Sequence, residues 1–175
     1  MTRLEYIMLS LPLVFMLHEY EEIIMFRHWL SKHRDALRHR FPKVEAWLSR
    51  QGVFGYSTAT FAVGTAHEFI LIAAVSGGAV WTGTYEWWFA ALVGHSVHLL
   101  IHLVQWLIYG QYIPAIFTTI LSLPYCIWAF TTYLTASRLS LLHVALWSLG
   151  GVVFAALSLY SAHRCMAKFC QWQKA

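Results

Sequence analysis

The chain has 175 residues, of which 59% are hydrophobic and only 11% are charged, and its formal net charge is +4. Soluble domains carry about 25% charged residues, so this composition argues against a soluble protein. It predicts an all-α integral membrane protein that forms a single domain, residues 1–175, with the lipid bilayer as its main partner. The basic residues are clustered rather than spread over the chain, which argues against nucleic acid as a partner.

Five segments are predicted to cross the bilayer as a five-helix transmembrane bundle, because each has the roughly 20 residues that about 30 Å of hydrocarbon requires. No small-residue cleavage site follows the first apolar run, so this run is interpreted as a retained span rather than a secretory signal. In chain order, the predicted spans are residues 4–26, 55–75, 87–107, 113–134 and 139–161.

The second half of the first span is polar and reads His18-Glu19-Tyr20-Glu21-Glu22. Positions i, i+3 and i+4 share a helix face, so His18, Glu21 and Glu22 should lie within an arc of about 100°. Glu19 should lie off the His18–Glu22 face. Ionisable groups in hydrocarbon cost at least about 2.5–3.5 kcal/mol each, and they are usually paired, metal-bound or in contact with a wet cavity. This stretch therefore indicates a functional site.

Residues 27–50 form the longest predicted loop and carry most of the positive charge. Apolar residues recur in this loop at loose helical spacing, which predicts an amphipathic helix on the membrane surface. The positive-inside rule places the loop and the C-terminus in the cytoplasm and the N-terminus outside. Of the 12 Lys and Arg residues, only Arg3 and Arg138 would remain outside.

The second and third spans carry further ionisable groups. Glu68 lies in the second span, one turn after Gly64, and helical spacing places His95, His98 and His102 on one stripe of the third span. At about 1.5 Å per residue, these groups reach a depth similar to that of His18. Three helices are therefore expected to bring polar groups to one level, between the middle of the membrane and its cytoplasmic side.

These histidines and carboxylates predict a metal site, although neutral histidines can also hydrogen-bond across a helix interface. Imidazole and carboxylate together bind Fe, Mn or Zn, and pairs at i, i+3 or i, i+4 on facing helices form di-metal sites in bundles. The set exceeds the needs of one tetrahedral zinc, so one or two divalent transition-metal ions are expected. The catalytic carboxylates would be Glu21, Glu22 and Glu68. The predicted metal ligands are His18, Glu21, Glu22, Glu68, His95, His98 and His102.

The segment from His18 to Glu22 resembles the motif of the HXXEE family of small membrane proteins. The family pattern also includes Ala-x3-Glu, Asn-x3-His and His-x3-His. Glu68 matches the glutamate of the first of these, with Gly64 in place of alanine, and the pair His98 and His102 matches the last. The chain contains no Asn, and Gly94 stands at the asparagine position if His98 is the histidine of that motif. The resemblance covers roughly residues 4–107 and implies a helical membrane protein, but no settled reaction.

Three classes of function fit these residues. The leading hypothesis is a non-haem, di-iron-like oxidoreductase that acts on a lipophilic small molecule, with His95 as an extra ligand or an orienting residue. The second is an intramembrane hydrolase that depends on zinc or on a glutamate pair. The third is a proton or metal-ion carrier or a ligand-binding membrane protein, for which a homodimer would supply the symmetry that transport requires.

Overall fold

The computed structural model describes residues 1–137 and 139–173, so the predicted external Arg138 lies outside the described residues. Within these ranges the chain is all-α and contains no strand. The elements are α1 (Arg3–Arg40), α2 (Pro42–Arg50), the 3-10 turn η1 (Val53–Gly55), α3 (Thr58–Thr82), α4 (Glu86–Tyr109), α5 (Ile116–Ser137) and α6 (Leu141–Trp172).

Four of these helices, α3 to α6, are long and apolar enough to cross a membrane. They correspond to the second to fifth predicted spans, with ends that differ by one to three residues, except that α3 continues to Thr82 and α6 to Trp172. The chain is thus an integral membrane protein by the length and composition of its helices. The first predicted span is the first half of α1, which is less apolar than the others because of its glutamates and basic residues.

Helix α1 continues well beyond the predicted end of the first span. It has 38 residues, so it is about 57 Å long at 1.5 Å per residue, and it includes the first half of the segment that was predicted as a loop. A capping box between Thr2 and Glu5 begins the helix. Pro42 ends it, since proline disfavours the helical conformation of the residue before it, and the same Pro42 is well suited to the first turn of α2.

A proline inside α1 leaves a carbonyl free, and a neighbouring helix binds it. Pro12 has no N–H group, so the carbonyl of Met8 lacks its usual helical donor. The indole Nε1 of Trp88 on α4 donates to this oxygen at 3.2 Å. This contact fixes α4 against the first half of α1 at a point where both side chains are fully buried.

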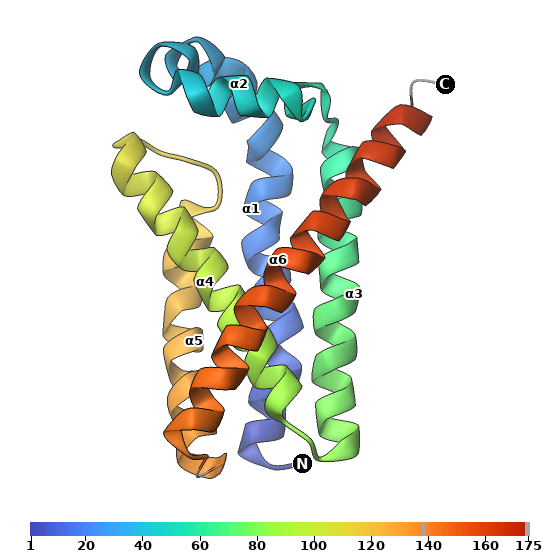
Figure 1. The fold of residues 1–175 in the computed structure, drawn as a ribbon, viewed down its shortest axis with the longest axis vertical. Helices are drawn as coiled ribbons and strands as arrows, with labels where there is room; N and C mark the ends of the chain where they lie inside the picture. The colour runs from blue at the N-terminus through green and yellow to red at the C-terminus, as the bar shows by residue number, and fades with distance from the viewer. Residues whose placement is uncertain (138, 174–175) are drawn as a thin grey trace.

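The five long helices run alternately up and down in chain order, so α2 and the end of α6 lie at one end of the molecule and the start of α1 at the other (Figure 1). Helix α1 packs between α3 and α5, while α6 crosses both α4 and α3. The α4–α6 crossing is close, because a Cβ atom on Gly151 would lie 2.3 Å from the carbonyl oxygen of Ala90.

Two clusters of buried apolar side chains stabilise the bundle, one on each side of the polar residues of α1. The first surrounds Ile7, Met8 and Leu11 near the start of α1, and the second surrounds Trp29 and Leu30 below α2. His18 and its neighbours lie between the two clusters. The polar groups are therefore enclosed by apolar layers on both sides along the bundle axis.

Candidate metal centre

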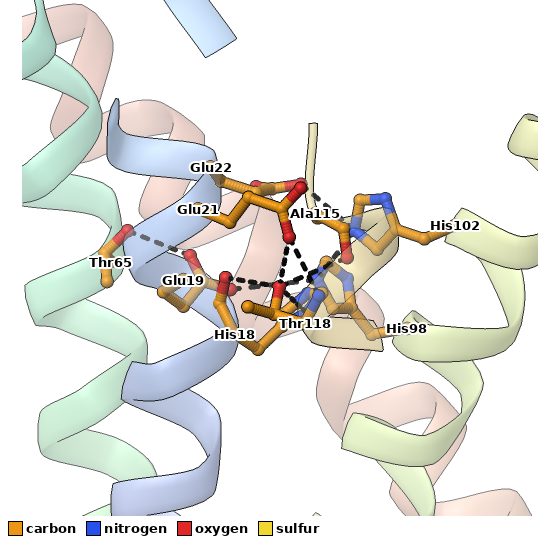
Figure 2. Close-up of polar contacts among 9 residues, drawn as sticks. All are labelled: His18, Glu19, Glu21, Glu22, Thr65, His98, His102, Ala115 and Thr118. Atoms are coloured by element: carbon orange, nitrogen blue, oxygen red, sulfur yellow. Dashed lines mark hydrogen bonds and ion pairs between the residues drawn. The ribbon is translucent and has the colours of Figure 1, made fainter. Parts of the chain in front are cut away.

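The polar residues of α1 divide between three neighbouring helices. Because successive residues turn by about 100°, Glu19 and Glu21 point about 160° apart, with His18 and Glu22 between them. Figure 2 shows His18 and Glu22 facing α4, Glu19 facing α3, and Glu21 facing the start of α5. One short segment thus places carboxylates in three directions.

Four side chains converge in the space between α1 and α4. They are His18 and Glu22 of α1 and His98 and His102 of α4, and one ligand atom from each lies within 4.8 Å of all the others. Nε2 of His102 lies 3.0 Å from Oε1 of Glu22 and 3.1 Å from Nε2 of His98. Three of the four are buried, with His18 at 0% and His102 at 7% exposure, and His98 is partly buried. Three imidazoles and one carboxylate form a donor set that could hold a metal ion.

The imidazole rings pack edge to face. The ring centroid of His18 lies 5.1 Å from those of both His98 and His102, and Nε2 of His18 has no hydrogen-bond partner among the described residues. His95 lies one turn earlier on α4, with its ring 6.0 Å from that of His18. It is outside the group of four, and neither of its ring nitrogens has a hydrogen-bond partner in the described part of the chain.

Glu19 lies closer to the histidines than helix geometry alone predicts. Its Oε1 lies 3.7 Å from Nε2 of His98, and its Oε2 accepts a hydrogen bond of 3.0 Å from the hydroxyl of Thr65 on α3. The side chain is 6% exposed. Glu19 was not among the predicted ligands, although an ionisable side chain inside a predicted span was a signal that it has a partner.

Glu21 is directed away from the group of four and binds the start of α5. Its Oε2 accepts hydrogen bonds from the backbone N–H of Thr118 at 2.8 Å and from its hydroxyl at 2.7 Å, and its Oε1 accepts one from the hydroxyl of Tyr112 at 2.9 Å. A carboxylate at the first turn of a helix accepts otherwise unpaired N–H groups and interacts favourably with the helix dipole. Glu21 therefore fixes α5 to α1.

Glu68 of α3 lies outside the group of four but faces the same interior. Its Oε1 lies 3.2 Å from Nδ1 of His67, and Nε2 of His67 lies 2.8 Å from the hydroxyl of Ser161 on α6. His67 thus connects Glu68 to α6, as an orienting residue would.

A cavity of about 620 Å³ adjoins these residues. Its walls come from α1, α2, α3, α4 and α6, and most of its lining is apolar. Its polar lining residues at the level of the four-residue group are Glu19, Glu22, Glu68, His95, His98 and His102.

The family model of a protein of unknown function with an HXXEE motif matches residues 9–129. The chain belongs to this HXXEE family. No curated protein and no solved structure matches the chain significantly.

The three letters of the HXXEE motif have different surroundings in this structure. His18 and Glu22 belong to the four-residue group, whereas Glu21 contacts α5. The two glutamates of the motif are adjacent in the chain, but they point to different neighbours because of the helical turn between them. The motif therefore combines two residues of the four-residue group with a residue that positions a helix.

Helix α6, which follows the matched region, packs against Gly64 and Gly94, where the sequence has glycine in place of the alanine and, if His98 is the histidine of Asn-x3-His, of the asparagine. A Cβ atom at Gly94 would lie 3.0 Å from Cβ of Ala155 and 3.2 Å from the carbonyl oxygen of Gly151. A Cβ atom at Gly64 would lie 2.7 Å from Sδ of Met166. Gly94 leaves no room for an asparagine against α6, and the flexible Met166 occupies the space next to Gly64.

Proposed function

We propose that the protein is a membrane-embedded metalloprotein that binds a divalent transition-metal ion through His18, Glu22, His98 and His102. In this proposal it is a non-haem oxidoreductase that acts on a lipophilic molecule. The observation that carries the proposal is the convergence of four donor atoms within 4.8 Å of one another inside an apolar bundle.

The distances fit a shared metal ion as well as hydrogen bonds, and the number of available protons favours the ion. Donor atoms that lie about 2.0–2.2 Å from one ion are separated from each other by about 3–4 Å. Nε2 of His102 lies about this far from both Glu22 and His98. A neutral imidazole nitrogen is either a donor or an acceptor, so a single proton satisfies only part of this arrangement, whereas a metal ion satisfies all of it.

The same residues support iron or manganese chemistry. Mixed imidazole and carboxylate ligation with open positions is typical of non-haem oxygen-dependent sites. Glu19 and Glu68 line the same cavity and are the carboxylates available to a second ion, which would give the di-metal form. A lipophilic substrate is supported by the apolar lining, since ligand pockets of about 300–1,000 Å³ are mostly apolar with a few polar groups at the reacting end.

The fold supports five membrane crossings, with residues 4–26 of α1 as the first. Alternation of the long helices places the basic segment at residues 27–50 and the end of α6 on the same side (Figure 1). The positive-inside rule makes this side cytoplasmic and gives α2 a place on the membrane surface. The orientation is tested with cysteines introduced singly at positions 2 and 51 of a variant in which Cys126, Cys165 and Cys170 are replaced by alanine. Only position 2 should react with a membrane-impermeant reagent from outside.

A zinc-dependent hydrolase is the second candidate, and the position of Glu19 favours it. Glu19 lies outside the group of four, and its Oε1 lies 3.7 Å from Nε2 of His98. A carboxylate there could act as a general base.

Metal analysis tests the proposal and distinguishes the two candidates. Protein purified without chelators, or reconstituted with Fe, Mn or Zn, should hold one or two ions per chain, and the double variant His98→Ala/His102→Ala should hold none. Stoichiometric iron with an optical band that changes on reduction supports the oxidoreductase. Zinc without such a band supports the hydrolase. Absence of any tightly bound metal after reconstitution overturns both.

A further inference from the structure

The two ends of the cavity differ in polarity. The end at the four-residue group contains three carboxylates and three histidines, whereas the end below α2 is lined by apolar and aromatic side chains such as Trp29, Leu37, Phe41 and Trp47. No lysine or arginine lines the cavity in the described part of the chain. An elongated ligand would therefore have its polar atom at the buried end and its apolar part toward the end nearest the membrane surface.

His95 provides an unused hydrogen-bonding group at the buried end. It lines the cavity, it is 5% exposed, and neither ring nitrogen has a hydrogen-bond partner among the described residues. A buried polar group without a hydrogen-bond partner destabilises the folded protein, so such a group in a native structure indicates a partner supplied by a ligand or by water. An uncharged oxygen, as in an alcohol, an aldehyde or an ester, is a suitable partner for a neutral imidazole.

The cavity opens between α4 and α6, beyond the point where these helices cross. Ile101 and Ile108 on α4 and Leu159 on α6 line the cavity and are also 47%, 63% and 37% exposed, so they form its rim. On two membrane-spanning helices, an apolar rim of this kind faces hydrocarbon. A molecule dissolved in the bilayer could enter here without crossing the aqueous phase.

The charges at the buried end select against an anionic ligand. Glu19, Glu22 and Glu68 line the cavity, and no basic side chain balances them among the lining residues. A carboxylate end would be disfavoured beside three acidic side chains, and an ammonium end would be disfavoured beside a divalent ion bound at the four-residue group. Burial of an unpaired charge here would be costly.

We infer that the ligand of this cavity is a neutral long-chain lipophile with one oxygen function. Its oxygen hydrogen-bonds to His95 beside the four-residue group, its chain extends toward α2, and it enters from the bilayer between α4 and α6. Such a lipophile would be the substrate of the enzyme proposed above, and its role as a substrate rests on that proposed function. Between His98 and Tyr109 the cavity follows α4 for about 16 Å, so a dodecyl chain should bind better than a butyl chain.

Photolabelling of the protein in lipid nanodiscs tests the inference without an activity assay. The probe is a long-chain alcohol with a diazirine near its apolar end, and labelled peptides are identified by mass spectrometry. Label is expected within residues 41–48 and 108–113. Dodecanol and dodecanal should block it at concentrations about tenfold lower than dodecanoate, dodecyl phosphate or dodecylamine, and butanol should not block it.

Variants connect this labelling to the cavity. Ala162→Trp, and the milder Ser158→Leu, place bulk in the α6 wall and should reduce labelling severalfold, whereas Leu157→Trp at an exposed position of α6 that does not line the cavity should not. His95→Phe should remove the advantage of dodecanol over dodecane, about tenfold for one hydrogen bond. Circular dichroism and size-exclusion chromatography verify that each variant is folded.

Labelling elsewhere in the chain, labelling unchanged in both α6 variants, or equal or better competition by dodecanoate or dodecylamine would overturn the inference. Metal content is measured on the same samples. Cavity labelling with no metal would contradict the proposed metalloprotein and leave the lipophile site intact, while bound metal with no cavity labelling would do the reverse.

Discussion

His102 and Glu22 connect α4 to α1 through a contact of 3.0 Å between Nε2 and Oε1, in the middle of an apolar bundle. Neither side chain would be stable there without a partner, because isolated buried charges and polar groups are costly. Nε2 of His102 also lies 3.1 Å from Nε2 of His98, so this nitrogen is close to both a carboxylate oxygen and a second imidazole nitrogen. A site of this kind makes separate predictions for metal binding and for stability.

Loss of one donor should weaken metal binding more than it weakens the fold. Glu22→Gln and His102→Gln roughly preserve side-chain size but each remove one proposed metal ligand. The affinity for the metal that copurifies should therefore fall at least about tenfold. Removal of a residue that only orients a ligand already has an effect of this size. Competition with a chromophoric chelator measures this. His143→Gln is the matched control, since His143 is exposed and bonds to Ser140 at the start of α6. Unchanged affinity in both ligand variants would exclude these residues as ligands.

Glu21 should behave differently from its neighbour Glu22. Glu21→Gln and Thr118→Val each disrupt charge-assisted hydrogen bonds between α1 and α5, so each should lower the free energy of unfolding by about 1.5–3 kcal/mol. Because the two residues contact each other, the double variant should lose less than the sum. Thermal unfolding in detergent measures the change, and metal content should stay at the wild-type value. A Glu21→Gln protein that keeps its stability but loses its metal would place Glu21 among the ligands.

Much of the fold follows from hydropathy, since the four apolar helices lie close to the predicted spans. The course of α1 did not follow from it. The change from apolar to basic residues near Phe26 marks a change of solvent, but Arg, Lys, Leu and Ala are all good helix formers, so the helix continues to Arg40. The chain direction changes only where Pro42 requires it.

The site was predictable to the extent that helical spacing determines it. His98 and His102 are one turn apart, and so are His18 and Glu22, and these are the residues that the structure brings together. The hydrogen-bond partners of Glu19 and Glu21 are Thr65 and Thr118, two common residues on other helices that no spacing rule connects to them. Helix α6 forms one wall of the cavity because it crosses α4 closely at Gly151 and Ala90. The sequence alone does not show that these two residues meet.

The corner between α1 and α2 should depend on pH through Glu45. Hydrogen bonds from Ser49 and Arg34 lower the pKa of the Glu45 carboxyl group below its usual value. A lowered folded-state pKa stabilises the folded corner above the unfolded pKa, and this contribution is lost as pH falls through the folded value. At about pH 6, hydrogen exchange in residues 42–50 should therefore be faster in Glu45→Gln than in the wild type. As the pH falls toward about 3, the two exchange rates should become equal. Asp35→Asn, at an exposed acidic residue of α1, serves as the control, and a ratio of the two exchange rates that does not change with pH would contradict the role of Glu45.

Two adjacent glycines of α6 should respond oppositely to alanine. A Cβ atom at Gly151 would lie 2.3 Å from the backbone oxygen of Ala90, whereas one at Gly150 would meet no atom within 4 Å. Gly151→Ala should therefore force α4 and α6 apart and cost about 1–3 kcal/mol of unfolding free energy, as overpacking does. Gly150→Ala should be neutral or stabilise the helix by up to about 1 kcal/mol, because alanine has the higher helix propensity. Thermal unfolding of the two variants in one detergent provides the comparison, and equal melting temperatures would mean that the helices do not cross at this point. Since the crossing also determines where the cavity begins to open, only Gly151→Ala should alter photolabelling by the long-chain alcohol.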